Sequence, residues 1–298
     1  MLRLPLVSII CSLCFLPGIL NAQEDTESIG ISTNTVILNA YITDRAGKPV
    51  RELPQNLFTI LENGAEQKIT FFEAQSTPFA VAILLDSSGS MEERIVLARA
   101  AALHFLDSLR PRDVAAVYTF DSKIREIRGF HLGRDLPESF YEVRSRGMTV
   151  LYDAIVRAAI ELEKRPEKRR AILVLSDGAD TQSAASKDKA LKAASKADAV
   201  IYSVDMSPTG TIGGPTQMNQ RALKELSDKT GGEYVRSSGG VEMREAFQRI
   251  ADELGTQYTL AYDPSDEKMD GKWRSIELKI RRPNLNIRTR RGYFAIQR

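Results

Sequence analysis

The chain has 298 residues, of which 43% are hydrophobic and 27% are charged. This composition is typical of a folded globular protein, and the length allows one large domain or two smaller ones. The 41 basic and 39 acidic side chains nearly cancel, so the net charge gives no argument for binding nucleic acid.

The N-terminal segment 1–22 has the layout of a secretory signal peptide. Arg3 precedes an almost unbroken apolar stretch, 4–20, and Ala22 offers a cleavage site before a polar run. An uncleaved membrane anchor is the alternative, although the stretch is short and contains two prolines. The sequence therefore predicts an exported protein, either periplasmic or secreted.

Both cysteines, Cys11 and Cys14, lie inside this leader. The mature chain would then contain no thiol, so neither disulfides nor thiolate metal sites are available to it. Its stability must come from core packing, with a hard metal ion as the remaining option.

Residues 31–75 are predicted to form an N-terminal flank of β-strands. Hydrophobic and polar residues alternate over 35–43, and the segment 58–72 places an Asn-Gly turn between two strand-like runs.

Residues 76–255 alternate short apolar runs with amphipathic stretches, which is typical of an α/β domain with a mainly parallel, doubly wound sheet. Six strands are expected, at 79–85, 113–120, 123–130, 171–176, 199–206 and 232–237. Helices are expected over 91–109, 151–164, 184–196, 216–229 and 241–254, with a short one near 135–143. Because only two residues separate the second and third runs, these strands should pair antiparallel.

Residues 256–298 form a C-terminal flank with three expected strands, at 256–264, 273–281 and 285–296. Each flank is marginal for stability on its own, so we expect the two flanks to pair into one β-sandwich-like module with the α/β domain inserted between them. The segment 266–277 has acidic residues at several EF-hand offsets. The lysine at its third offset and the strand pattern that follows favour a hairpin loop instead.

Polar side chains follow the first and fourth expected strands of the α/β domain. In "LLDSSGSMEE", Asp86, Ser88 and Ser90 come directly after an apolar run. Asp177 directly follows the fourth strand, and Thr149 precedes a helix. With the common strand order 3-2-1-4-5-6, the first and fourth strands are neighbours, and ligands bind at their carboxyl ends. We therefore expect these five side chains to converge.

Each of these residues also has a purely structural explanation. Ser90 and Glu93 fit a helix capping box, Thr149 can cap a helix, and Asp177 with the following glycine is ordinary turn chemistry. Asp121, between the second and third strands, either supports the site from outside the ligand set or stabilises a hairpin turn. Convergence on one crevice is what separates function from coincidence.

The donor set is made of oxygen atoms only. Two carboxylates and three hydroxyls suit Mg²⁺, with Mn²⁺ or Ca²⁺ as alternatives, and they are poorly suited to Zn²⁺.

"DSSGSM", followed by the distant Thr149 and Asp177, resembles the von Willebrand factor A-type (VWA) domain with its metal-ion-dependent adhesion site, whose motif is DxSxS followed by a Thr and an Asp. The resemblance covers roughly residues 79–254. The flanking stretches "ITDRAGKPVRELPQNLFTILENG", "YTLAYDP" and "RTRRGYFA" further resemble a bacterial family of exported VWA-related proteins.

The resemblance implies that Ser88 and Ser90 bind a cation directly, while Asp86, Thr149 and Asp177 bind it directly or through water. It also implies one open coordination position, which a carboxylate from an Asp or Glu of a partner protein fills. The expected function is adhesion-type binding of another macromolecule, without a nucleic-acid partner or a small-molecule substrate.

Two other function classes remain open. One alternative function is a structural envelope scaffold with a permanently held ion, and the other is a metal-dependent hydrolase. Catalysis is disfavoured because the two histidines, His104 and His131, lie in no recognisable catalytic motif.

Overall fold

The computed structural model describes residues 35–74, 77–207, 214–237 and 240–296. The predicted signal peptide and its two cysteines lie outside these residues. Across the described ranges, no helix has the length and apolar character needed to cross a membrane.

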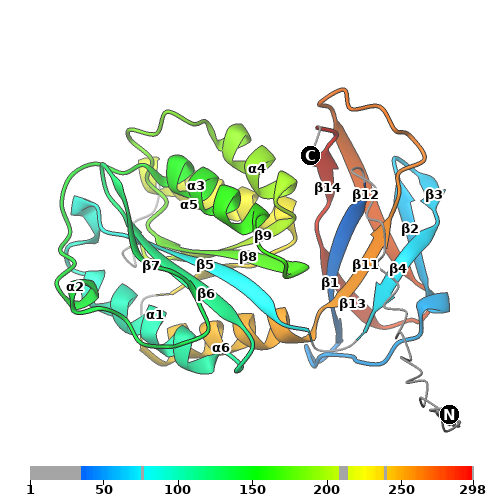
Figure 1. Ribbon diagram of the computed structural model, residues 1–298, viewed down its shortest axis with the longest axis horizontal. Helices are drawn as coiled ribbons and strands as arrows, with labels where there is room; N and C mark the ends of the chain where they lie inside the picture. Colours follow the sequence, from blue (N-terminus) through cyan, green and yellow to red (C-terminus); the bar gives the residue numbers. More distant parts are fainter. Residues whose placement is uncertain (1–34, 75–76, 208–213, 238–239, 297–298) are drawn as a thin grey trace, which may run out of the picture. The chain divides into compact units, whose positions relative to one another are not determined.

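A six-stranded sheet forms the centre of the α/β domain (Figure 1). Its strands are β5 (Phe79–Asp86), β6 (Val114–Phe120), β7 (Ile124–His131), β8 (Arg169–Ser176), β9 (Ala199–Asp205) and β10 (Tyr234–Arg236). Their order is β10-β9-β8-β5-β6-β7, and β7 pairs antiparallel with β6 while the other pairs are parallel. The expected doubly wound sheet, its strand order and its antiparallel edge are confirmed.

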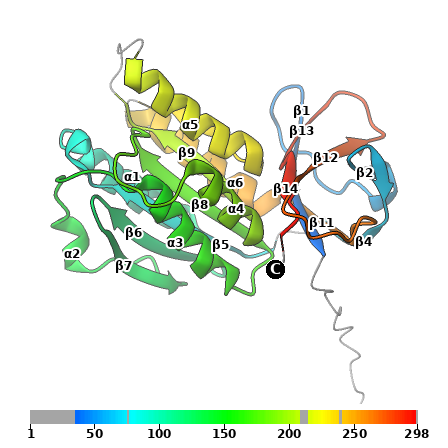
Figure 2. The same cartoon turned by 90° about the horizontal axis from the view of Figure 1, so that it is seen from above.

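Helices cover both faces of this sheet (Figures 1 and 2). On one face lie α1 (Ile95–Ser108) and α6 (Gly240–Thr256), together with the short α2 (Glu138–Tyr141). On the other face lie α3 (Leu151–Glu163), α4 (Lys187–Lys196) and α5 (Gly214–Thr230). The expected helices are therefore present, with α1 beginning four residues later than the sequence pattern suggests.

The central strand β5 explains why the strands of this sheet have unbroken apolar sequences. Every residue of β5 is buried, and its side chains alternate between the two hydrophobic cores. Val81, Ile83 and Leu85 pack into the core under α1 and α6, whereas Ala80, Ala82 and Leu84 pack into the core under α3, α4 and α5. A strand covered on both faces needs no polar side, so its sequence does not alternate in polarity.

The two flanks build one module of two four-stranded sheets. The N-terminal flank supplies β1 (Val36–Asp44), β2 (Phe58–Glu62), β3 (Ala65–Gln67) and β4 (Ile69–Glu73), and the C-terminal flank supplies β11 (Tyr258–Tyr262), β12 (Trp273–Ile280), β13 (Leu285–Thr289) and β14 (Gly292–Phe294). The strand orders are β13-β1-β11-β4 and β14-β12-β2-β3. Both sheets contribute to one hydrophobic core, so the expected pairing of the flanks is confirmed.

The strand count of the flanks differs from the sequence expectation. Each flank supplies four strands rather than three, because the expected strand 285–296 divides into β13 and β14, which belong to different sheets. The segment 58–72 divides in the same way at β3 and β4. Between β13 and β14, the buried side chain of Arg290 pairs with Asp198 at 3.0 Å. Polarity that alternates every second residue marks one buried face, but it does not say in which sheet the face lies.

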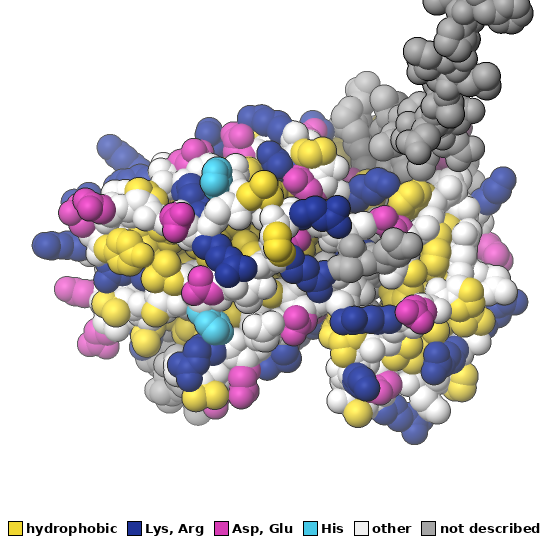
Figure 3. Space-filling model, turned by 60° about the horizontal axis from the view of Figure 1, so that its bottom comes forward, with side chains coloured by type: hydrophobic (Ala, Val, Ile, Leu, Met, Phe, Trp, Pro, Cys, Tyr) yellow, Lys and Arg dark blue, Asp and Glu magenta, His cyan; other side chains and the backbone are white. Residues whose placement is uncertain are grey.

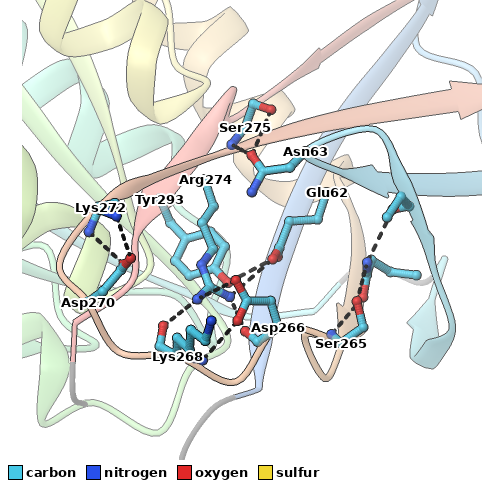
Figure 4. Close-up of polar contacts among 12 residues, drawn as sticks. Glu62, Asn63, Ser265, Asp266, Lys268, Asp270, Lys272, Arg274, Ser275 and Tyr293 are labelled. Carbon is cyan, nitrogen blue, oxygen red and sulfur yellow. Dashed lines mark hydrogen bonds and ion pairs between the residues drawn. The ribbon is translucent and has the colours of Figure 1, made fainter.

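The connection between β11 and β12 also corrects an expectation. It joins strands of different sheets, so it is not the predicted hairpin loop. Figure 4 shows that the acidic side chains of this loop bind within the protein: Asp266 and Asp270 accept hydrogen bonds from the backbone N–H groups of Lys268 and Lys272 at 3.2 and 3.0 Å. These aspartates act as turn residues, which agrees with the expectation that segment 266–277 is not an EF-hand loop.

The same loop is anchored to the sandwich core through Arg274 (Figure 4). The buried guanidinium donates hydrogen bonds to the carbonyls of Asp266 and Lys268 and pairs with Glu62 at 3.3 Å. The hydroxyls of Tyr262 and Tyr293 donate to the same carboxylate at 2.7 and 3.0 Å. Glu62 is therefore a buried charge with a cation and two hydroxyl partners, which is the condition under which such a charge is tolerated.

Candidate functional site

Two strand ends meet at the carboxyl edge of the central sheet. Asp86 and Ser176 are the last residues of the neighbouring strands β5 and β8. The Ser176 hydroxyl donates a 2.5 Å hydrogen bond to Oδ2 of Asp86 and accepts one of 2.9 Å from the backbone N–H of Gly178. Asp177 stands between Ser176 and Gly178 in the chain, and its negative charge contributes to the raised pKa of Asp86. The two carboxylates predicted for the site are thus neighbours.

The loop after β5 brings its hydroxyls together. Oδ1 of Asp86 accepts a 2.9 Å hydrogen bond from the backbone N–H of Ser88, which fixes the start of the loop. The hydroxyl oxygens of Ser88 and Ser90 lie 3.2 Å apart. Asp86 and Ser88 are buried, whereas Ser90 is exposed. The oxygen atoms of this loop therefore run from the interior to the surface.

Backbone hydrogen bonds tie the segment of Thr149 to both other segments. The N–H of Arg146 donates to the carbonyl of Ser87 at 2.8 Å, and the N–H of Gly89 donates to the carbonyl of Gly147 at 3.2 Å. The carbonyl of Thr149 accepts hydrogen bonds from the N–H groups of residues 181 and 182, both at 3.0 Å. The three segments that carry the five predicted residues therefore form a closed hydrogen-bonded ring.

Of the purely structural explanations for these residues, the turn role of Asp177 holds and the two helix-capping roles do not. Helix α1 begins at Ile95, far from a Ser90 cap, and no side chain caps its N-terminus. Helix α3 is preceded by Val150 rather than capped by Thr149. Asp177 does act as a turn residue, because its Oδ1 accepts a 3.1 Å hydrogen bond from the N–H of Ala179. Helix capping thus accounts for neither hydroxyl.

Asp121 has its carboxylate engaged in the turn between β6 and β7. One oxygen accepts a 2.9 Å hydrogen bond from the N–H of Lys123, and the other pairs with Arg125 at 2.8 Å. The backbone carbonyl of Asp121 accepts a 3.0 Å hydrogen bond from the N–H of Val150, the residue after Thr149. Its side chain stabilises the hairpin, while its main chain helps to hold the Thr149 segment.

The electrostatics of Asp86 favour a bound cation. Burial raises the pKa of Asp86 to about 7, and the negative charge of Asp177 adds to the rise, while hydrogen bonds from Ser176 and Ser88 oppose it. Within the described ranges, no Lys or Arg forms an ion pair with Asp86. A fully buried carboxylate beside a second carboxylate, without a basic partner, fits a site that holds a positive ion.

The available donors restrict which ion fits. In the part of the chain that the structure describes, no three His, Cys, Asp or Glu side chains gather into a group able to hold a metal. An ion between Asp86 and Asp177 would therefore depend on hydroxyl oxygens and water for its remaining ligands. Magnesium accepts this situation, because it is usually bound by one or two carboxylates and keeps several waters.

Neither histidine lies at this edge of the sheet. His131 pairs with Ala115 near the start of β6, at the opposite edge, and its Nδ1 accepts a 2.7 Å hydrogen bond from the N–H of Gly133. His104 lies in the second half of α1, away from the loop that precedes this helix. An imidazole base at the candidate site is therefore absent from the described structure.

Sequence reasoning missed three residues of this edge. The first is Ser176, which orients Asp86. The second is Asp205, which lies opposite Ser176 at the end of β9 and accepts hydrogen bonds from the N–H of Ser207 and the hydroxyl of Tyr234 at 2.8 and 2.6 Å. Gly147 has φ +75°, and a Cβ there would lie 2.7 Å from the Ser122 hydroxyl. The available signal was a polar residue at the last position of a buried apolar strand.

Comparisons with known proteins agree with the fold. A family model for the von Willebrand factor type A domain matches residues 81–179, a range that contains all five predicted site residues. A von Willebrand factor type A structure from Catenulispora acidiphila matches with a TM-score of 0.50 and 12% identity, covering 86% of this chain and 73% of that chain.

Two further structures are similar over smaller shares of the chain. BatB from Bacteroides thetaiotaomicron has a TM-score of 0.48 and 18% identity, covering 59% of this chain and 98% of its own. The PilB minor pilin from Streptococcus sanguinis has a TM-score of 0.48 and 13% identity, with shares of 62% and 63%. The search of curated proteins gave no match. With the matched range, the strand order and the flanking helices in agreement, the α/β domain of this chain has the fold of a von Willebrand factor type A domain.

Proposed function

We propose that this is a non-enzymatic binding protein in which Asp86, Ser88, Ser90, Thr149 and Asp177 hold a divalent cation, and that the cation binds a carboxylate of a partner protein. Mg²⁺ is the proposed ion, with Mn²⁺ and Ca²⁺ as alternatives. The observation that carries the proposal is the fully buried Asp86, which has no basic partner among the described residues and stands beside Asp177.

The chemistry of the donors supports an external ligand. Hydroxyls and water are neutral ligands, so an ion that contacts them directly, and an aspartate only through water, keeps positive charge for an external anion. Ser90 is exposed, so the site reaches the protein surface. An incoming Asp or Glu side chain is the anion that a partner protein can supply there.

A catalytic role for this site has less support. A carboxyl group whose pKa is about 7 suits acid-base chemistry, but Asp86 is fully buried and a substrate does not reach it. No imidazole is available at this edge as a substitute base. We therefore propose binding rather than hydrolysis, and expect neither a small-molecule substrate nor nucleic acid as partner.

The proposal extends to location and to the scaffold alternative. The sequence pattern of residues 1–22 supports export, to the periplasm or outside the cell. A structural scaffold would hold its ion with every coordination position filled by the protein, whereas an adhesion-type site keeps one position open to water or to a partner.

The test is to load the full chain with a cation and to measure both the stability of the protein and the access of water to the ion. Mg²⁺ at a hundred times its dissociation constant should raise the free energy of unfolding by about 2.7 kcal/mol, and Asp86→Ala should abolish this gain. With Mn²⁺, water-proton relaxation should reveal an exchangeable water on the ion. A gain in stability without exchangeable water would favour the scaffold, and no gain at all would contradict the cation site.

A further inference from the structure

Five exposed basic side chains lie at one end of the β-sandwich, which we call the basic end. Three of them are in the segment 45–57 between β1 and β2, and two are in the link 281–284 between β12 and β13. The five are Arg45, Lys48, Arg51, Arg281 and Arg282. These two segments contain one acidic residue, Glu52, so the basic end has an excess of positive charge.

Strand pairing and hydrogen bonds hold the two segments side by side. β1 and β13 pair antiparallel, so that Asp44 at the end of β1 lies opposite Leu285 at the start of β13. The backbone N–H of Arg281 donates a 2.8 Å hydrogen bond to the carbonyl of Leu57, and its guanidinium donates to the carbonyl of Asn56. The five basic residues therefore belong to one surface, although they come from both flanks of the chain.

The main chain of the longer segment is fixed from inside the sandwich. The buried hydroxyl of Tyr258 donates a 3.0 Å hydrogen bond to the carbonyl of Val50 and accepts one of 3.0 Å from the N–H of Leu53. Just before the segment, the carboxylate of Asp44 accepts a 2.9 Å hydrogen bond from the N–H of Lys48. Because the main chain is already ordered, a ligand of the basic end has to order only the side chains.

The basic end has positive charge to offer to an external anion. Among the described residues, none of its five basic side chains forms an ion pair with a carboxylate. Two other arginines of the C-terminal flank do form such pairs, Arg288 with Glu233 and Glu253, and Arg290 with Asp198. Charge that is not paired inside the protein sets up a field that attracts anions from solution.

The opposite end of the sandwich has the opposite charge. Tyr262 at the end of β11 pairs with Val36 at the start of β1, so the loop 263–272 lies at the other end from the segment 45–57. This loop, part of which is shown in Figure 4, contains four acidic and two basic residues. Figure 3 brings forward the end that is lowest in Figure 1, and Lys and Arg side chains lie around this end on its right-hand half, which is the sandwich. A negatively charged surface attracts one end and repels the other, so it orients the protein.

The composition of the basic end favours a lipid surface over other polyanions. Neither of its two segments contains an aromatic residue. Proteins that bind single-stranded nucleic acid stack the bases on aromatic side chains along a basic groove. Lipid headgroups need no such platform, because their phosphates form a plane that several Lys and Arg side chains on exposed loops approach at once.

We propose that the basic end of the β-sandwich binds the surface of a membrane that contains anionic lipids, with its five basic side chains as ligands of the lipid phosphates. This inference is independent of the cation site, because it uses residues of the other module. Each Lys or Arg that reaches the surface should strengthen binding roughly fivefold, and the attraction should weaken as the salt concentration rises.

The test measures cosedimentation of the full chain with vesicles. One set of vesicles contains phosphatidylcholine alone, and the other contains equal parts of phosphatidylcholine and phosphatidylglycerol. All samples contain EDTA, so that no divalent cation at Asp86 joins the protein to a lipid phosphate. The apolar leader 1–22 is present in every sample and contributes equally when variants are compared.

The expected result is a preference for the anionic vesicles that salt removes. If three of the five side chains reach the surface, binding to the anionic vesicles should be stronger by roughly a hundredfold. Most of this difference should disappear between about 50 mM and about 500 mM NaCl. Asp86→Ala should bind the vesicles like the wild type, which separates this inference from the proposed function.

Variants that remove two charges locate the binding surface. Arg281→Gln with Arg282→Gln, and separately Arg45→Gln with Lys48→Gln, should each weaken binding to the anionic vesicles roughly thirtyfold. The second pair decides the outcome if the first pair lowers the melting temperature, because the guanidinium of Arg281 also bonds to Asn56.

The matched control removes the same charge from another part of the surface. Lys189 of α4 and Arg221 of α5 are exposed, and neither forms an ion pair among the residues that the structure describes. Lys189→Gln with Arg221→Gln should weaken binding less than about fivefold, since neither residue lies at the basic end.

Three results would overturn the proposal. The first is equal binding to both kinds of vesicle. The second is a control pair that weakens binding as much as the two pairs of the basic end, because net charge rather than this surface would then drive binding. The third is retention on dextran sulfate beads through the same residues without vesicle binding, which would assign the basic end to a soluble polyanion.

Discussion

Ser176 donates a 2.5 Å hydrogen bond to Asp86, although 90 positions separate them in the chain. The contact exists because β5 and β8 are neighbours in the sheet, so that their last residues lie side by side. A buried carboxylate held by a hydroxyl has a fixed orientation, and groups that orient a metal ligand affect affinity without touching the ion.

Ser176→Ala should therefore weaken Mg²⁺ binding by about 10- to 100-fold, because Asp86 loses the hydrogen bond that orients it. Isothermal titration calorimetry would measure the affinity. Ser203→Ala is the matched control, since Ser203 is a fully buried serine of the neighbouring strand β9, hydrogen-bonded to Ser227. Both variants lose a buried hydrogen bond, at a cost of about 1 kcal/mol in stability. Equal Mg²⁺ affinity in the two variants would remove Ser176 from the site.

Thr149→Val tests the hydroxyl of Thr149 separately from its backbone. The backbone carbonyl of Thr149 holds residues 181 and 182, and valine keeps both of these hydrogen bonds. We expect unchanged stability in EDTA, within about 0.5 kcal/mol, together with a loss of the Mg²⁺-dependent gain in melting temperature. Differential scanning fluorimetry with and without Mg²⁺ makes the comparison. A full gain in the variant would mean that the Thr149 hydroxyl does not act in cation binding.

The strand order of the α/β domain could be predicted because its elements are strongly patterned. The apolar run that ends at Asp86 forms a strand with both faces covered. The link after Phe120, expected to have two residues and found to have three, is too short for anything but an antiparallel hairpin. Once the order is known, the ends of β5 and β8 must meet. The segments of Asp86 and Asp177 are adjacent for that reason, and the resemblance of the motif named the same residues.

The flanks and the supporting residues could not be predicted in the same way. Alternation over 285–296 gives a strand pattern, yet the chain changes sheets at Arg290, where the pairing with Asp198 depends on a residue 92 positions away. Ser176 looks in sequence like any small residue at the end of a strand. Its role depends on which side chain lies opposite it, and that is a property of the assembled sheet.

The pH dependence of the cation-free protein should report on Asp86. Burial raises the pKa of Asp86 to about 7 in the folded chain, above its ordinary value of 3.8, so the protonated form is favoured by folding. The stability that this group contributes is fully present below its unfolded pKa and is lost as the pH rises through about 7. In EDTA, we therefore expect the melting temperature of the wild type to fall relative to that of Asp86→Asn as the pH rises across this window.

Cation binding should show the opposite trend, because protons and the cation compete for Asp86. The affinity for Mg²⁺ should rise as the pH increases through about 7, and the gain in melting temperature should increase with it. Scanning fluorimetry of both proteins over this window, with Mg²⁺ and with EDTA, tests both trends. An Mg²⁺ affinity independent of pH would show that Asp86 is ionised throughout and does not exchange a proton for the ion.

The buried ion pair of the sandwich predicts a stability effect that is independent of the cation. Glu62 and Arg274 pair at 3.3 Å with almost no exposure of either side chain (Figure 4). Arg274→Met leaves the carboxylate of Glu62 buried without its cation, which should cost about 3–5 kcal/mol of unfolding free energy. The exposed pair of Lys279 and Glu277 is the control, and Lys279→Met should cost about 0–1 kcal/mol. Urea unfolding monitored by circular dichroism measures both. Adding Glu62→Gln to Arg274→Met should recover part of the lost stability, because the unpaired charge is then gone. A double variant as unstable as Arg274→Met alone would contradict this explanation. The destabilisation would then come from the lost contacts of Arg274 with the 263–272 loop rather than from the charge of Glu62.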